Sequence, residues 1–275
     1  MSKTPLMIVL VLYKESIQQI PAYPVIRQLA EKKDIQLIIY DNSPLEQSDA
    51  LFSATNVQYK HDASNPGLAV AYNWALANIR EEQLLVVFDQ DTLFSASYIE
   101  KLQSVPLTTE ISAIVPRIMS HEQQISPLDA SDYIDHQAQP ICTPGLIRKR
   151  VMAINSGTAF SVSFLKEIGG FNLEFPLDFL DHWFFWKSDQ SKKAVYLIDE
   201  TFTHDLSVFD YTKISLQRYQ SIVDAEMRFY QVYDKKYLRR HQKQLLLRTV
   251  KQFFTIKERQ IWRTTVRTFL RSRKG

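Results

Sequence analysis

The stretch LLVVFDQDT, residues 84–92, decides how the rest of the chain is interpreted. Five apolar residues followed by two aspartates with one residue between them are typical of a buried strand that ends at a polar edge. If the strand geometry continued, Asp89 and Asp91 would point to one face, and a tight turn could also bring their carboxylates together. Like charges at such short range favour a compensating cation.

Hard divalent cations suit this pair. Mg²⁺ and Mn²⁺ take one or two carboxylates together with phosphate oxygens, so Asp89 and Asp91 indicate a metal-bridged diphosphate. The spacing alone also fits a structural pair, in which Asp89 caps a turn and Asp91 starts the next helix. The residues around the stretch are needed to weigh the two explanations.

Apolar runs of strand length recur on both sides of the stretch and alternate with segments of helical character. In residues 66–82 the apolar side chains recur every three or four positions, the period of a helix with one buried face. This alternation predicts an α/β fold with a mainly parallel sheet covered by helices. The runs are residues 6–13, 35–41, 56–60, 84–89 and 111–116.

Polar residues follow two more of these strands. Asp41 ends the run at 35–41, and Asn65 and Gly67 open the helix after the run at 56–60. Ligands gather at the carboxyl ends of parallel strands, where an aspartate can bond a base or ribose and free helix amides can bind an anion. Asp41 in a β-turn and Asn65 as a plain helix cap are the structural alternatives. Three polar strand ends in order along one sheet favour a ligand site.

The chain changes character after residue 120. Residues 120–150 are rich in polar residues and proline and predict a long loop or lid. From about residue 211 there is hardly a Gly or Pro, which predicts two or three helices. We therefore divide the chain into a nucleotide-sugar-binding and catalytic domain, 1–210, and a basic helical region, 211–275.

Charge is unevenly distributed. Residues 235–275 contain 14 Lys or Arg against one acid, so this segment has net charge +13, and with +3 overall the remainder carries −10. Such a segment predicts an electrostatic partner of its own. Nucleic acid is not expected, because no recognition module is present and the acidic body would repel a long polyanion.

The last helical segment, residues 257–275, is amphipathic in sequence. Arginines recur every four positions opposite aromatic and aliphatic residues, which predicts contact with an anionic membrane surface. A docked helix with solvated arginines is the alternative. The arginines are Arg259, Arg263, Arg267 and Arg271, and the apolar residues are Ile261, Trp262, Val266, Phe269 and Leu270.

The single cysteine, Cys142, excludes a disulfide framework within the chain, and no Cys/His spacing resembles a zinc site. Apolar runs of about seven residues fall short of the roughly 20 that cross a bilayer. The N-terminus lacks a cleavage site, so we expect no signal peptide and a reducing, cytosolic setting.

Five motifs together resemble family 2 glycosyltransferases with the GT-A fold, closest to the bacterial rhamnosyltransferase-like branch. The resemblance extends over roughly residues 8–205 and implies a Rossmann-like mixed, mainly parallel sheet flanked by helices, with a C-terminal helical extension. The motifs are LVLYKES (10–16), IIYDNSP (38–44), NPGLAVAYNWAL (65–76), LLVVFDQDT (84–92) and NSGTAFSVSFLKEIGGFN (155–172).

The resemblance assigns a role to each strand-end residue. By that likeness, Asp41 would meet the nucleobase, Asn65, Gly67 and Asn73 would line the nucleotide pocket, Asp89 would lie near the ribose, diphosphate and metal, and Asp91 would be the main ligand of Mn²⁺ or Mg²⁺. His204, after the run at 194–198, would be a further metal ligand. A lone histidine is otherwise more often a surface or packing residue.

An acidic general base is also implied, within residues 175–188. Asp181 matches best and Asp178 is the rival; members of this branch often have a Glu two positions after the base, where this chain has Trp183. A carboxylate can remove the proton of an acceptor hydroxyl as its bond to the anomeric carbon forms, and one such displacement inverts that centre. Without the resemblance, Asp181 is readily explained as a helix cap.

The implied function is inverting, metal-dependent transfer of a sugar from a nucleotide diphosphate donor, with dTDP-rhamnose expected first and a UDP-hexose second. The acceptor would be a lipid-linked (polyprenyl) or surface polysaccharide, and the enzyme would be peripheral at the inner face of the cell membrane. A sugar-1-phosphate nucleotidyltransferase is one alternative, although LVLYKES lacks its usual Gly-rich loop with Arg. A non-catalytic scaffold that kept the fold is the other, and the retained Asp89, Asp91 and Asp181 argue against it.

Overall fold

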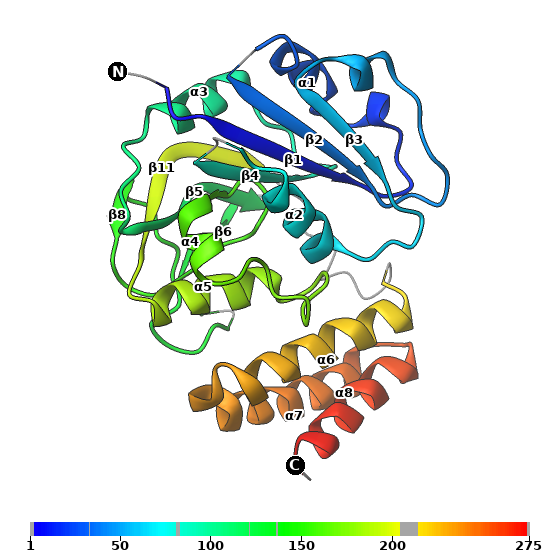
Figure 1. Ribbon diagram of the computed structural model, residues 1–275. Helices are drawn as coiled ribbons and strands as arrows, with labels where there is room; N and C mark the ends of the chain where they lie inside the picture. The colour runs from blue at the N-terminus through cyan, green and yellow to red at the C-terminus, as the bar shows by residue number, and fades with distance from the viewer. Residues whose placement is uncertain are drawn as a thin grey trace.

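A computed structural model describes residues 3–32, 34–80, 83–120, 122–135, 137–203 and 214–273 (Figure 1). The strands are β1 (Leu6–Leu12), β2 (Ile35–Asp41), β3 (Val57–His61), β4 (Leu84–Asp89), β5 (Ile111–Ser120), β6 (Gln123–Ser126), β7 (Leu128–Asp129), β8 (Gly145–Ile147), β9 (Val151–Met152), β10 (Ala159–Ser161) and β11 (Ala194–Thr203). The helices are α1 (Tyr23–Leu29), α2 (Leu68–Ala77), α3 (Ala96–Ser104), α4 (Val162–Glu167), α5 (Leu180–Gln190), α6 (Leu216–Val232), α7 (Leu238–Thr255) and α8 (Arg259–Ser272), with short 3-10 helices at Ile17–Gln19, Ala50–Ser53 and Lys235–Tyr237.

Most described strands form one mixed sheet of nine strands, in the order β3-β2-β1-β4-β10-β5-β11-β8, with β6 paired to β5. β1 pairs in parallel with both β2 and β4, β2 with β3, and β5 with β11. The order reverses at β1, because β2 and β3 extend the sheet on one side and the chain then crosses back to place β4 on the other. The predicted α/β fold with a mainly parallel sheet is confirmed.

The short strand β10 is inserted antiparallel between β4 and β5. Because β10 runs against β4, the residues that precede it lie beside the carboxyl end of β4. Val87 N–H donates to Thr158 O at 3.1 Å, and Gly157 N–H donates to Val87 O at 2.8 Å. The segment 155–158 therefore borders the acidic stretch that follows β4.

Strand side chains alternate between two apolar cores, one on each face of the sheet. Val9 and Val87 belong to the core under α2, α4 and α5, whereas Leu10 and Phe88 belong to the core under α1 and α3. Figure 1 shows these two groups of helices on opposite faces. Burial on both faces explains why the strands are continuously apolar rather than alternating.

Residues 120–150, predicted to be a long loop or lid, are partly strand. β6 and β8 join the main sheet, while β7 pairs with β9 in a separate two-stranded sheet. The prediction of an unpaired loop was wrong in this respect. Strands of two to four residues are too short to show a readable alternation of apolar and polar side chains.

The C-terminal region is helical, as predicted. Its three long helices share a small core formed by α6, α7 and α8, and α6 also contributes Phe229 and Tyr230 to the core that contains α5. The docked alternative therefore holds for α8, which buries Ile261 and Thr265 against the other two helices. None of the described helices combines the length and apolarity needed to cross a bilayer. The exact division at residue 210 stays a prediction.

Candidate active site

The turn after β4 is held by hydrogen bonds on two sides. On one side, Asp89 N–H donates to Ser156 Oγ at 2.9 Å, and Ser156 Oγ shares a 2.6 Å hydrogen bond with Thr92 Oγ1. On the other, Gln90 Oε1 accepts Tyr13 N–H at 2.7 Å, and its amide donates to Tyr13 O at 3.3 Å. The turn that carries the acidic pair is thus held to Tyr13, directly after β1, and to the segment before β10.

The acidic pair supplies two carboxylates at the carboxyl end of β4, with Asp89 half-buried and Asp91 exposed. In the described ranges, no three His, Cys, Asp or Glu side chains are grouped closely enough to hold a metal by themselves. His204, the further ligand expected from sequence, lies outside those ranges. Two carboxylates fit Mg²⁺ or Mn²⁺, because such ions commonly complete their coordination with water and substrate phosphate. The donor set therefore fits the predicted ion as a site shared with substrate.

Asp181 lies in the first turn of α5, behind Phe179, whose φ of 64° is left-handed. Its Oδ1 accepts His182 N–H at 2.8 Å. Burial raises the pKa of Asp181 to about 7, with further contributions from the negative charges of Asp178 and Asp89. The interaction with Asp89 shows that the structure brings the predicted base into electrostatic range of the acidic turn.

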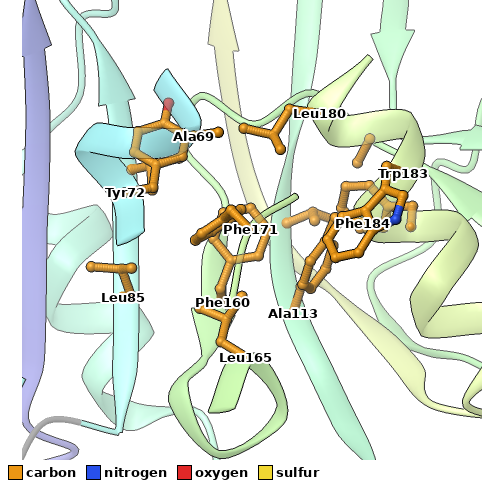
Figure 2. Packing of buried hydrophobic residues seen from close by; sticks show 14 of the residues in the cluster. Ala69, Tyr72, Leu85, Ala113, Phe160, Leu165, Phe171, Leu180, Trp183 and Phe184 are labelled. Atoms are coloured by element: carbon orange, nitrogen blue, oxygen red, sulfur yellow. The ribbon is translucent and has the colours of Figure 1, made fainter. Parts of the chain in front are cut away.

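Tyr72 of α2 connects these two groups. Its hydroxyl is buried and has no hydrogen-bond partner among the described residues. Burial first, and then the carboxylates of Asp89 and Asp181, raise its pKa well above the ordinary value. Figure 2 shows Tyr72 and Leu180, the neighbour of Asp181, above the aromatic core of the sheet. The three-to-four spacing in residues 66–82 predicts a buried helix face, but periodicity cannot show that the Tyr72 hydroxyl on that face lies near two carboxylates.

Asp178, the rival base, is committed to an ion pair. Both its oxygens accept hydrogen bonds from the Arg218 guanidinium on α6, one of them at 2.6 Å. Burial raises the pKa of Asp178, and the arginine charge opposes that rise by stabilising the ionised form. Because the guanidinium also occupies both carboxylate oxygens, Asp178 is less free than Asp181 to accept a proton from substrate. This geometry favours Asp181 over Asp178 as the base.

Asp41 is fully buried at the end of β2. Its Oδ1 accepts Ser43 N–H at 2.9 Å and its Oδ2 accepts the Tyr59 hydroxyl at 2.8 Å. The residue braces the turn after β2, as its structural alternative requires. A direct contact with a nucleobase stays a prediction, since the base would have to share an oxygen already in use.

A cavity of about 490 Å³ lies beside that turn, at the carboxyl ends of β1 and β2. It is lined by residues 14–16, 43–45, 47 and 48, and its volume is typical of small-molecule sites. These loop residues fall within the motifs LVLYKES and IIYDNSP, but their ordinary composition gives no sign in the sequence that they line a cavity. A second cavity, of about 380 Å³, is lined by residues near the amino end of β4 and the start of α4, and no acidic residue lines it.

The loop that opens α2 packs against the loop that precedes α5. Asn65 and Gly67 both have positive φ, 48° and 95°, and a Cβ on Gly67 would lie 2.4 Å from Pro176 O. Ala69 N–H donates to the same oxygen at 3.2 Å. One of the free amides expected to bind an anion is therefore used within the protein, and Gly67 lets the loop that precedes α5 approach closely. The nucleotide contact of Asn65 and Gly67 stays a prediction.

Asn73 has a different role from the one expected. Its amide nitrogen donates to Phe171 O at 2.8 Å, and its oxygen accepts Phe171 N–H at 2.7 Å. Both polar atoms thus tie α2 to the Gly169–Gly170 turn. We leave Asn73 out of the nucleotide pocket; the sequence placed it on a helix but could not show which backbone it meets.

These features identify the class of fold. A mixed sheet with a parallel half, a cavity at the ends of β1 and β2, and an acidic turn at the end of β4 are the architecture of a GT-A fold. The family model described as Glycosyl transferase family 2 matches residues 9–169, more than half of the chain. The chain belongs to this family and is a glycosyltransferase, which confirms the resemblance seen in the sequence.

Three solved structures share the fold. GalNAc-T7 with UDP, GalNAc and Mn²⁺ has a TM-score of 0.56 at 14% identity over 83% of this chain, which spans only 50% of that one. Mannosyltransferase PcManGT from Pyrobaculum calidifontis, in complex with GDP-Man and Mn²⁺, has a TM-score of 0.54 at 13% identity, covering 99% and 86% of the two chains. S. aureus TarS 1–349 has a TM-score of 0.51 at 11% identity, covering 98% and 81%. No curated protein sequence matches the chain.

Proposed function

We propose that the chain is an inverting, divalent-metal-dependent glycosyltransferase that moves a sugar from a nucleotide diphosphate donor to a hydroxyl of a glycan acceptor. The observation that carries the proposal is the position of Asp181, with its raised pKa, within electrostatic range of Asp89 in the acidic turn, with the Tyr72 hydroxyl near both carboxylates. Family membership supports it, as do the nucleotides and Mn²⁺ named for two structural neighbours.

Donor binding would use the carboxyl ends of β1, β2 and β4. The cavity beside Ser43 would take the nucleoside, and Asp91, with Asp89, would hold Mn²⁺ or Mg²⁺ against the diphosphate. When bound, the ion offsets the negative charge that builds on the leaving diphosphate. Gln90 keeps the turn in place by its two bonds to Tyr13, so the carboxylates would need little rearrangement.

Asp181 would act on the acceptor. A pKa of about 7 leaves about half of its carboxyl groups ionised at neutral pH, a balance that suits a general base. As the acceptor oxygen bonds to the anomeric carbon, its proton passes to Asp181 and the bond to the diphosphate breaks, releasing the nucleoside diphosphate. Attack opposite the leaving group inverts the anomeric centre.

For the substrates, we propose dTDP-rhamnose as the first donor to test and a UDP-hexose as the second, with a lipid-linked or surface polysaccharide acceptor. The DQDT form of the acidic turn supports the first choice by its resemblance to the rhamnosyltransferase-like branch. A nucleotidyltransferase or a non-catalytic scaffold is less well supported, because neither explains a base beside the acidic turn in a family 2 chain.

A screen of nucleotide sugars tests the proposal. The full chain is incubated with each donor, a lipid-linked acceptor and Mn²⁺, and release of nucleoside diphosphate is measured with and without chelator. We expect release from one donor that needs both metal and acceptor. Asp189→Asn, at the other end of α5 from Asp181, is the matched control and should keep the activity. No release from any donor, or release unaffected by chelation, would count against the proposal.

A further inference from the structure

One side of α7 presents large apolar side chains that the described parts of the chain leave uncovered. They recur at spacings of three and four residues and so form a single stripe, which we call the α7 face. The opposite side, with Leu245, Thr249 and Gln252, is buried against the neighbouring helices. The α7 face consists of Leu246, Leu247, Val250, Phe253 and Phe254, with exposed fractions of 44, 51, 51, 44 and 78%.

Cations and an indole lie beside the α7 face. The Arg259 guanidinium is 5.3 Å from the centre of the Phe253 ring and donates to Phe253 O at 3.0 Å. Trp262 meets the same ring edge-on at 5.4 Å, and Arg263 lies 5.6 Å from the Trp262 ring. Lys251 is exposed on α7 itself. Aromatic, aliphatic and cationic groups are thus combined on one surface.

The net charge of residues 235–275 indicates which kind of partner binds the α7 face. Residues 235–275 carry +13, so a second copy of the chain would set like charges against each other. Nucleic acid would satisfy the charge but would leave the apolar side chains without partners. An anionic bilayer offers both negative headgroups and apolar acyl chains, the combination that basic amphipathic helices bind.

We propose that the α7 face, flanked by Arg259 and Arg263, docks on an anionic phospholipid surface with its apolar side chains at the acyl boundary. This moves the apolar part of the contact away from α8, which sequence analysis favoured, because α8 turns Ile261 and Thr265 into the helical core. α8 contributes the arginines. The proposal does not depend on which reaction the active site catalyses.

Docking through the α7 face would also fix which side of the molecule meets the bilayer. Figure 1 shows α6, α7 and α8 as a layer on the α5 side of the sheet. α6 joins that layer to α5 through the Arg218–Asp178 pair and through Phe229. The bilayer would therefore lie on the side of the molecule that carries the helix of the proposed base.

Vesicle flotation with the full chain tests the docking. Vesicles of phosphatidylcholine alone are compared with vesicles that contain about one third phosphatidylglycerol, over a range of salt concentrations. We expect binding to the anionic vesicles only, weakened by salt. The double substitution Leu247→Gln/Phe254→Gln should lower the bound fraction about tenfold, because it removes apolar area without changing charge.

Leu146→Gln is the matched control, since Leu146 is 36% exposed on the edge strand β8, outside the helical region, and it should bind as the unsubstituted chain does. Thermal melts and nucleotide release check that the variants are folded, and neither enters the flotation result. Equal flotation of the double variant, or no binding by the unsubstituted chain, overturns the proposal. So does a dimer in sedimentation that the double substitution dissociates, because the α7 face would then bind a second copy.

Discussion

At Asp181 the burial that destabilises the ionised carboxylate is also what suits this residue to act as a general base. Its carboxyl group is held in the first turn of α5 near two other acids, and burial is the largest cause of its raised pKa. An ionised group in such a place is poorly solvated. The same poor solvation makes it a stronger proton acceptor than an exposed aspartate, and two predictions follow from this single residue.

The pH dependence of transfer should follow the ionisation of Asp181. With a pKa of about 7, the base is protonated in acid, so the rate should rise with pH through about 7 and level off above it. Asp181→Asn should lower the rate by about 10² to 10⁴-fold and remove that rise. Initial rates at saturating donor measure both effects, with Asp189→Asn as the control. A variant that kept the pH-dependent rise would exclude Asp181 as the base.

The same substitution should stabilise the fold at alkaline pH. Because the pKa of Asp181 is raised from 3.8 to about 7, the folded chain binds more protons than the unfolded chain between those values. Its contribution to the free energy of unfolding therefore falls as pH rises through that window. Asp181→Asn should raise the melting temperature at pH 8 relative to its effect at pH 4. An effect equal at both pH values would show that the carboxyl is not perturbed by folding.

Asp91 belongs to the metal part of the proposal. Asp91→Asn should abolish transfer with little change in melting temperature, because the side chain is exposed and the turn is held through Gln90 and Ser156. Donor affinity measured against Mn²⁺ concentration should lose its metal dependence. Full activity in this variant would remove the metal role.

At the scale of elements, α6 positions the base-bearing segment. Arg218 pairs with Asp178, and Phe229 packs against Phe179 and His182 on either side of Asp181. His182 is half-buried as a residue, but its Nδ1 atom is buried, and burial lowers its pKa to about 4, so the ring is a neutral packing group. The helical region and the active site are therefore one packed unit at this point.

Arg218→Met should disturb the active site from a distance. Without its partner, the buried Asp178 would add uncompensated negative charge beside Asp181, and the midpoint of the pH–rate profile should move upwards. Stability should fall by about 2 kcal/mol, less than for a fully buried pair because Arg218 is partly exposed. Arg228→Met is the control. Like Arg218, Arg228 lies on α6, but its pair with Glu174 is exposed, so its loss should leave the midpoint of the pH–rate profile unchanged. An unmoved midpoint in Arg218→Met would mean that the pair is only structural.

Elements with strong periodicity could be predicted from sequence, and short ones could not. β1, β2 and β4 follow long apolar runs, and α2 follows a three-to-four spacing. β10 is only three residues long and pairs antiparallel with β4 and β5. No local sequence pattern predicts these two pairings, because the partner strands lie far away in the sequence. The acidic turn was found because its chemistry is local, whereas the roles of Tyr72, Asn73 and Arg218 depend on contacts between distant segments.

At the scale of the whole molecule, the basic helical region packs against the rest of the fold, because Phe229 and Tyr230 of α6 belong to the core that contains α2 and α5. Tyr219 of α6, Gln252 of α7 and Thr265 of α8 form a buried hydrogen-bond network, and Leu245 packs with Ile261 in the same core. Charge counting identified the region as distinct, but counting cannot show which side chains face inwards. That is why the packing of Ile261 and Thr265 of α8 against α6 and α7 could not be read from the charge pattern, while membrane contact by the region stays a prediction.

Truncation after Thr255 should therefore destabilise the protein. Removing α8 exposes Leu245 and leaves the Gln252 amide without Thr265, so we expect a lower melting temperature and increased aggregation. Thermal melts of the truncated and full chains measure the difference. As a control, removal of only the last three residues should have little effect on melting. An unchanged melting temperature after the longer truncation would show that α8 adds nothing to the core.

The contact between Gly67 and Pro176 limits how loops can be exchanged between related enzymes. The Pro176 carbonyl occupies the place that a side chain at Gly67 would need and accepts the Ala69 amide, so each loop is shaped to the other. A chimaera that takes residues 172–179 from a relative would need residues 65–69 from the same parent. The two loops should accordingly be grafted as one cassette when either is exchanged between family members.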